Sequence, residues 1–370
     1  MSKLPDNPNA LDPLELESAP EPDASDPGGD KGIDRVMLAA QTTNSENRGL
    51  INELADTQGI DRANVLYAAK LKSSTDEEAP YHWIHLDANA ADVKSDLKKL
   101  IPQFDSLAID AVLDRDARPR SLVEEEWSYL ILRAVNFNEG EDTHDMIAIR
   151  VARGARFLVT LTYRDSRTIG RIAAIKPARL AQLSSGDLMV KIVNLVTDFK
   201  EAVIDQLQDQ MDALEARVLD APKVELRRQI VEIRKQAILL RRYIAPQKEA
   251  IGIFRKDADE LISDKNRRSL ADNWDTITRY LEDLDAVRER ASVIKDELVN
   301  ILSDRLNRNL YVISVITAIF LPLGFLTGLF GINIGGMPGT EDSDAFSFFV
   351  WVLIALVGIQ IVLFKWFKWF

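Results

Sequence analysis

A short uncharged motif, Gly331-Ile332-Asn333, lies inside a stretch without any charged side chain, residues 309–340. An Asn side-chain oxygen, repeated around a ring of identical chains, would present neutral acceptors to an incoming hydrated cation. Neutral dipoles can hold a hydration shell without binding the ion too tightly to release it. The alternative is that Asn333 only caps the C-terminus of a helix, a common role for Asn. Taken alone, the motif favours the helix cap.

Two apolar segments must position this motif. Residues 311–330 and 345–364 each contain twenty residues without a charge, and twenty helical residues span about 30 Å, the thickness of the hydrocarbon core of a bilayer. Because the connection between them is short, they predict a hairpin that crosses the membrane twice. We expect a transmembrane pore helix at 310–333, an outer acidic loop at 334–344, a second transmembrane helix at 345–364 and a basic-aromatic tail at 365–370.

Positive charges flank the two segments on the same side of the hairpin. Arg305 and Arg308 precede the first segment, and Lys365 and Lys368 follow the second. Short flanks rich in Lys and Arg stay in the cytoplasm, which predicts a multi-pass protein with both termini inside. The linking loop has no Lys or Arg and carries three acids, Glu341, Asp342 and Asp344. In a ring of chains these acids would form a negative collar that concentrates cations, although loop solubility explains them equally well.

A single hairpin encloses no lumen, so a pore requires identical first segments around the axis of a closed oligomer. The alternative is a hairpin that merely anchors a cytoplasmic scaffold or sensor. Pro322 favours a pore because it frees the carbonyl of Ala318, which membrane helices tolerate where protein or a watery cavity supplies a partner. Gly324, Gly328 and Gly331 share one face and would allow close helix contact. On these residues a pore is the better interpretation.

The rest of the chain is expected to be cytoplasmic. Residues 1–34 hold nine acids, two lysines and six prolines, which predicts a disordered acidic tail. Strand-like and helix-like patterns then alternate, so residues 35–186 predict an α/β domain. Residues 187–309 predict a helical stalk, in which Pro246 and Gly252 indicate a break or kink.

The last stalk helix is expected to continue into the membrane. Residues 253–321 contain no Gly or Pro, so one helix would run from near Lys265 to Phe330. Apolar residues from Leu270 to Ile301 recur in steps of three and four, interrupted only at Arg288. This repeat indicates a seam that needs helical partners.

Composition excludes several classes of function. The chain has no cysteine and three histidines, and His82 and His85, three residues apart on a predicted strand, would point to opposite faces. A conventional zinc site within one chain is therefore not expected. The net charge of −12 argues against a nucleic-acid partner. Because the sequence has no Gly-rich phosphate loop and no plausible nucleophile constellation, we expect neither an enzyme nor a bound cofactor.

The run from Phe320 to Asn333, FLPLGFLTGLFGIN, followed by IGGMPG, resembles the CorA superfamily of divalent metal-ion transporters. Members of that superfamily typically end the pore helix in Gly-Met-Asn, and the Ile and the Gly-Gly-x-Pro-Gly continuation look more like its zinc-transporter (ZntB) branch. Magnesium-type members usually carry an acid soon after Met-Pro, where this chain has Gly339. The resemblance extends to residues 117–120, 132–136 and 156–160.

The resemblance implies a homopentamer in the bacterial inner membrane, built as a funnel of cytoplasmic α/β domains, long α-helical stalks and a two-helix transmembrane hairpin. It implies transport of Zn2+ as a hydrated ion that meets Asn333, with Mg2+, Co2+, Ni2+ or Cd2+ as other cargo and a magnesium or cobalt channel as the alternative. It also implies a second Asn at the inner mouth, 26 residues before Asn333, where Asn307 lies. Hydrophobic constrictions would fall near Leu310 and Ile313, with Thr317 and Leu321 further out.

Overall fold

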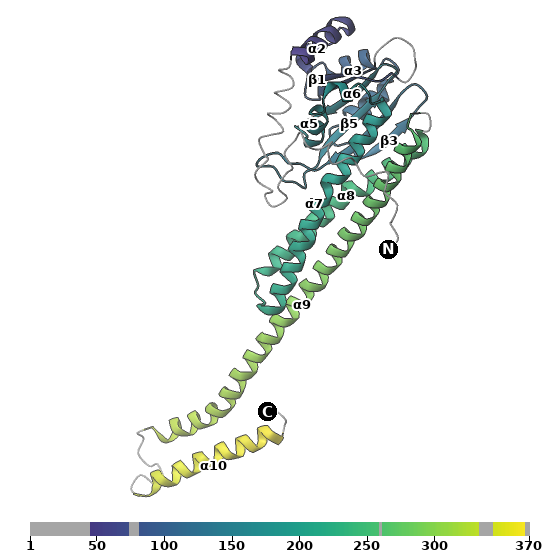
Figure 1. Cartoon of the computed structure of the whole chain (residues 1–370). Helices are drawn as coiled ribbons and strands as arrows, with labels where there is room; N and C mark the ends of the chain where they lie inside the picture. Colours follow the sequence, from purple (N-terminus) through teal and green to yellow (C-terminus); the bar gives the residue numbers. More distant parts are fainter. Residues whose placement is uncertain (1–44, 74–80, 259–260, 333–342, 367–370) are drawn as a thin grey trace, which may run out of the picture. The chain divides into compact units, whose positions relative to one another are not determined.

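A computed structural model of the chain describes residues 45–73, 81–258, 261–332 and 343–366. The predicted acidic tail, residues 1–34, lies outside the described residues. The chain divides into two compact units: the first holds the residues up to Ala213 together with Ile230–Ser292, and the second holds Leu214–Gln229 and Val293–Phe370. The first unit contains the sheet, and the second contains both predicted membrane segments (Figure 1).

The first unit is built on a six-stranded mixed sheet with the order β1-β2-β6-β5-β4-β3. Only β2 and β6 pair in parallel, and the other neighbours are antiparallel. Strands β4 and β6 are buried along their whole length, as expected when both faces of a sheet are covered. The strands are β1 (Val65–Leu71), β2 (Tyr81–Asp87), β3 (Arg120–Val123), β4 (Ser128–Ala134), β5 (Ile147–Arg153) and β6 (Phe157–Thr162).

A tight turn joins β5 to β6. The amide of Gly154 donates to the carbonyl of Phe157 at 2.9 Å. A Cβ atom at Gly154 would lie 2.9 Å from the side chain of Ile101, so the close approach of the turn to Ile101 requires glycine.

One face of the sheet shares a hydrophobic core with three helices, α2 (Ser45–Gln58), α3 (Val93–Leu100) and α4 (Ser106–Leu113). Helix α4 begins where the Asp105 carboxylate accepts a hydrogen bond from the amide of Ala108 at 2.6 Å, a regular N-cap. The core of this layer includes Ile84, Leu97 and Phe104, all without exposed surface. The shorter helical segments are η2 (Arg62–Asn64), α5 (Arg167–Ala173) and α6 (Pro177–Leu180).

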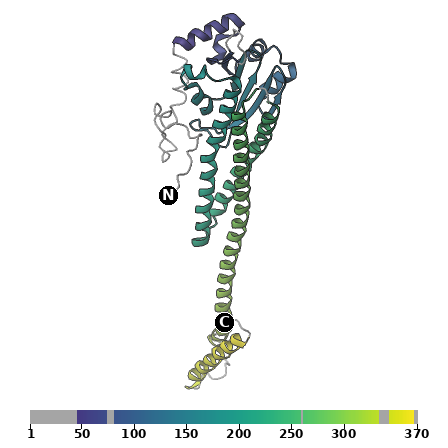
Figure 2. The same ribbon diagram turned by 45° about the vertical axis from the view of Figure 1, so that its right-hand side comes forward.

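Long helices make up most of the remaining chain: α7 (Ser185–Asp220), α8 (Leu226–Asp257), α9 (Asp264–Phe330) and α10 (Ala345–Trp366). Within the first unit, α7, α8 and the start of α9 run side by side in both views (Figures 1 and 2). Asn273 of α9 donates to the Asn194 side chain of α7 at 2.7 Å, and Arg241 of α8 pairs with Asp285 of α9 at 2.9 Å. The fold class expected from the sequence, an α/β domain followed by long helices and an apolar hairpin, is confirmed.

Of the break or kink expected near Pro246 and Gly252, the break is wrong, because α8 continues through both residues, and the kink stays a prediction. A proline inside a helix removes one hydrogen bond and costs about 3 kcal/mol. On either side of it, Ile244, Gln247 and Ile251 are fully buried. Burying such side chains contributes more than the lost bond costs, so the packing holds the helix together.

The seam of α9 also differs from the expected one. Val287 is buried next to Arg288, where the expected repeat was interrupted. Tyr280 is buried, whereas Leu281, the expected seam residue, is only half-buried. The buried positions then recur without interruption every three or four residues. Within the first unit the partners of this seam are α7 and α8 of the same chain, so the seam by itself does not demand a second chain.

His82 and His85 are both buried in the sheet and make separate contacts. His82 stacks on Phe157, with ring centroids 5.9 Å apart, and Nδ1 of His85 lies 3.0 Å from Oγ1 of Thr160. Burial lowers the pKa of His85 to about 4, against the opposing effect of its hydrogen bond to the Thr160 backbone. His85 is therefore a neutral core residue at pH 7.

We expect His85 to make the chain acid-sensitive. Between about pH 6.5 and pH 4 the unfolded chain binds a proton on His85 that the folded chain does not, so the free energy of unfolding falls as the pH falls. The loss is about 2 kcal/mol between pH 7 and pH 5. Denaturant unfolding of the full chain at both pH values would measure it. In His85→Gln the fall in the free energy of unfolding between pH 7 and pH 5 should be smaller by that amount. An equal fall in the variant and the native chain would show that His85 is not its source.

Candidate ion pathway

Helices α9 and α10 are both long and apolar enough to cross a membrane. Their most apolar eighteen-residue windows have mean hydropathies of 2.2 and 2.6, and 0% and 6% of those windows are buried in the chain. The core helix of a soluble protein would be mostly buried. These two helices instead present their apolar side chains outward, as membrane spans do.

A hydrogen bond joins α9 to α10 in the middle of the hairpin. Nε2 of Gln360 donates to the carbonyl of Ala318 at 3.2 Å. That carbonyl is the one that Pro322 leaves without its helical partner, because proline has no amide hydrogen. Gln360 is 8% exposed, the most buried residue of α10. Of the two partners that the sequence left open for this carbonyl, protein or a watery cavity, the structure shows protein; the sequence signal for Gln360 is a lone amide in an apolar segment.

The side of α9 that packs on α10 is defined by burial. Val315 is 9% exposed, and Ala318, Ile319 and Pro322 are half-buried. At the far end of the hairpin the ring of Phe330 packs on that of Phe349, with centroids 5.0 Å apart. These contacts fix which face of α9 is covered by its own chain.

The residues expected to line a pore lie on the other side of α9. Ile313 and Thr317 are each two residues from Val315, a rotation of about 200° and therefore nearly opposite. Leu310 and Leu321 continue this face in steps of three and four residues. All four are exposed, Ile313 at 60% and Leu321 at 70%. We define them as the free face of α9: Leu310, Ile313, Thr317 and Leu321.

The polar groups of the free face are uncharged. The Thr317 hydroxyl donates to the carbonyl of Ile313 at 2.9 Å, so its oxygen keeps its lone pairs for an outside donor or cation. Ser314, at the edge of this face, donates in the same way to Leu310 at 2.8 Å. Such a surface can pass a hydrated cation but offers no ligand set that would retain it.

The structure describes only some of the other predicted site residues, those of the inner mouth, the Gly331-Ile332-Asn333 motif and the outer loop. Asn307 is exposed but lies about 120° around an ideal helix from Ile313, at the side of the free face. Gly331 and Ile332 are exposed just after α9 ends, and Asp344 is exposed just before α10. Asn333, Glu341 and Asp342 lie outside the described residues.

The glycines of α9 make no close contact within the described chain. An added Cβ atom at Gly324 or Gly328 would meet nothing within 4 Å. The close packing that these glycines permit is therefore not made with α10. Among the described residues, no group of three or more His, Cys, Asp or Glu side chains could hold a metal ion.

We expect Gln360→Leu to destabilise the hairpin by about 1–2 kcal/mol, the range of interhelical hydrogen bonds in membranes. In a Pro322→Ala background the amide of residue 322 again serves the Ala318 carbonyl, so the same substitution should cost less than half as much. A double-mutant cycle of unfolding in mixed detergent would measure both costs. Equal costs in the two backgrounds would show that Gln360 does not act through that carbonyl.

Comparison with known proteins places the chain in a family. The family model described as "CorA-like Mg2+ transporter protein" matches residues 78–368, which include strands β2 to β6, the long helices and both apolar helices. The chain belongs to this CorA-like family of divalent-cation transporters. Relatives place this CorA-like chain in the ZntB branch: the zinc transport protein ZntB of Yersinia enterocolitica is 32% identical over 275 residues, covering 74% of this chain and 84% of the relative. The ZntB protein of Pectobacterium atrosepticum is 32% identical over 276 residues, covering 75% and 84%.

Solved structures share the fold of this CorA-like chain. The full-length CmaX protein matches with a TM-score of 0.71 and 25% identity, covering 82% of this chain and 98% of that protein. The CorA magnesium transporter of Methanocaldococcus jannaschii matches with a TM-score of 0.66 and 17% identity, covering 80% and 96%. At that identity the second likeness shows the fold alone.

Proposed function

We propose that this CorA-like chain carries divalent metal cations, with zinc as the main cargo, along a pore lined by the free face of α9. The observation that carries the proposal is the position of that face. It is uncharged, it bears the Thr317 oxygen, and it lies opposite the side that α10 covers. One chain leaves it open, and only a ring of copies would turn it toward a common axis.

The ring is proposed to be a homopentamer, as the resemblance to CorA proteins implies. Gly324 and Gly328 support close packing between copies, because nothing in their own chain occupies the space beside them. Their position on α9, close to the free face, would bring neighbouring pore helices together.

Zinc is proposed because the relatives in the ZntB branch are named as zinc transport proteins. The Gly331-Ile332-Asn333 ending supports the same branch. Magnesium or cobalt is the second candidate, since the family description names Mg2+. In either case Asn333 would meet the hydrated ion first, and Asn307 would lie near the inner mouth.

The proposed topology places both termini in the cytoplasm of a bacterial cell, with the hairpin in the inner membrane. Arg305 and Arg308 before the first span, and Lys365 after the second, support this orientation. The loop at 334–344 would then lie outside, where Glu341, Asp342 and Asp344 attract cations. Residues 35–186 would form the cytoplasmic α/β domain and residues 187–309 the stalk.

Flux measurements in liposomes would test the function. The purified full-length chain is reconstituted into liposomes that each entrap a dye selective for one ion, Zn2+, Mg2+ or Co2+, and that ion is added to these liposomes and to protein-free liposomes with the same dye. We expect zinc entry well above that in protein-free liposomes and faster than magnesium entry. Faster entry of magnesium would favour the second candidate. No entry of any of the three ions would contradict transport and favour a membrane-anchored scaffold.

A further inference from the structure

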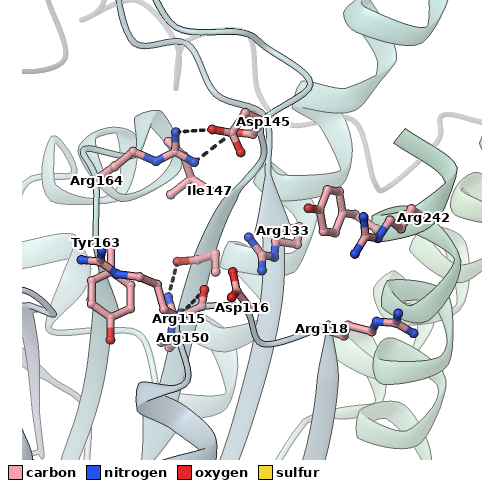
Figure 3. Close-up of a pocket in the computed structure, with 12 residues that line it drawn as sticks. Arg115, Asp116, Arg118, Arg133, Asp145, Ile147, Arg150, Tyr163, Arg164 and Arg242 are labelled. Atoms are coloured by element: carbon pink, nitrogen blue, oxygen red, sulfur yellow. Dashed lines mark hydrogen bonds and ion pairs between the residues drawn. The ribbon is translucent and has the colours of Figure 1, made fainter. Parts of the chain in front are cut away.

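A cavity in the first unit is lined almost entirely by charged side chains. It has a volume of about 580 Å3 and contains six arginines and two aspartates, which leaves four positive charges in excess. The lining comes from five separate places: the loop between α4 and β3, strand β4, the start of β5, the end of β6 and helix α8 (Figure 3). Its residues belong to the first unit, whereas the ion pathway belongs to the second, and they play no part in the proposed transport step.

Two of the arginines are buried parts of the fold. Arg150 on β5 has no exposed surface, and Arg133 on β4 is 8% exposed. Main-chain carbonyls orient both guanidinium groups: Arg150 donates to Asp114 at 2.6 Å, and Arg133 donates to Ala117 at 2.8 Å. The Nε atom of each has no hydrogen-bond partner among the described residues.

Aromatic rings hold the same arginines from the side. The guanidinium groups of Arg115 and Arg150 each lie 4.6 Å from the centroid of Tyr163. Arg133 lies 4.9 Å from the centroid of Tyr243, a residue of α8 that also lines the cavity. Stacking on rings and bonding to carbonyls fixes the direction of these cations without neutralising them.

The cavity has fewer counter-charges than arginines. Arg164 pairs with Glu141 and Asp145 at 2.7 and 2.8 Å. The other five arginines have no ion pair with any described residue. Burial lowers the pKa of Arg150 to about 10, and the nearby positive charge of Arg133 acts in the same direction. Buried charges are normally paired, and Arg133 and Arg150 are buried without an ion pair to any described residue, which indicates a missing anion beside them.

We propose that this cavity binds a small anion that carries two or more linked phosphate groups. Guanidinium groups bind phosphate oxygens bidentately, and a di- or triphosphate matches the four positive charges in excess better than a single phosphate does. The volume suits a ligand between pyrophosphate and a nucleoside triphosphate, within the usual range of ligand pockets. Such a ligand would report the metabolic state of the cytoplasm to the transporter.

Calorimetric titration of the full-length chain in detergent, in metal-free buffer, tests the proposal. The probes are inorganic pyrophosphate, ADP, ATP and inorganic phosphate. We expect saturable binding of one pyrophosphate or nucleotide per chain, with single phosphate at least tenfold weaker. Tighter binding of ATP than of pyrophosphate would identify a nucleotide site, and equal binding an inorganic polyphosphate site. No saturable binding of any probe at millimolar concentration would overturn the proposal.

Matched variants separate the cavity from general surface charge. Arg115→Gln with Arg118→Gln removes two exposed cavity arginines, and Arg156→Gln with Arg234→Gln removes two exposed arginines elsewhere in the first unit. The first pair should weaken pyrophosphate binding at least tenfold, and the second should leave it within twofold. Equal weakening in both would overturn the proposal. The proposal would also be overturned if the native chain binds no anion and the oligomer of the Arg115→Gln/Arg118→Gln variant dissociates. In that case the cavity would receive an acidic segment of a neighbouring copy.

Discussion

Asn333→Gly should abolish zinc flux, by at least tenfold, while the oligomer stays assembled. If Asn333 is the entry ligand, glycine removes its oxygen from every chain at one level of the pore. If Asn333 is only a helix cap, glycine serves equally well and flux should stay near normal. Helix α9 ends at Phe330, and the amide of Gly331 donates to the carbonyl of Gly328 at 3.2 Å, whereas Asn333 itself lies outside the described residues.

Two further substitutions sharpen this test. Asn333→Asp should bind cations more tightly and conduct them more slowly, because a ring of carboxylates retains an ion that must also leave. Asn333→Gln keeps an amide oxygen and should retain more flux than Asn333→Ala. Zinc entry into liposomes, with size-exclusion chromatography as the control for assembly, would measure the series. Normal flux through the glycine variant would end the assignment of Asn333 as the filter.

Ile313→Asn should raise the basal leak of cations several-fold. A ring of Ile313 and Leu310 side chains on the free face can block ions by excluding water from a narrow constriction. An amide there would admit water, and Leu310→Asn should act in the same direction. The measurement is the rate at which entrapped zinc leaves the liposomes when no other ion has a gradient across the membrane.

Val312→Asn is the matched control for the leak. Val312 is also branched and exposed, at 49% against 60% for Ile313, but one residue along the helix turns it by about 100°. It should raise the leak little, because it does not lie on the free face. Equal leaks in the two variants would show that polarity anywhere on α9, and not a gate, causes the leak.

The sequence predicted the elements whose patterns are local. The two apolar segments, the continuous helix from near Lys265 to Phe330 and the alternation of strands and helices in residues 35–186 follow from apolar runs and from local strand-like and helix-like patterns. Strand β3 was not predicted because it has only four residues, Arg120–Val123, and depends on pairing with β4. The continuity of α8 through Pro246 was not predicted because tertiary packing decides it.

The candidate sites divide in the same way. The residues of the free face of α9 were expected because the sequence resembles CorA proteins, and helical spacing is consistent with Ile313 and Thr317 sharing a face. That this face stays open could not be known, since it depends on α10 covering Val315 on the opposite side. The arginine-lined cavity was beyond reach because five segments far apart in the chain supply its side chains.

Chemical modification of single cysteines tests most directly whether ions travel along the free face. The chain has no native cysteine, so each introduced thiol is unique. A positively charged methanethiosulfonate reagent is applied to liposomes that contain Thr317→Cys, or Ile319→Cys as the control on the side facing α10. The account predicts that the reagent lowers zinc flux more than tenfold in the first variant, reversibly with a reductant, and less than twofold in the second. Block of both variants to the same extent, or of Ile319→Cys alone, would contradict it.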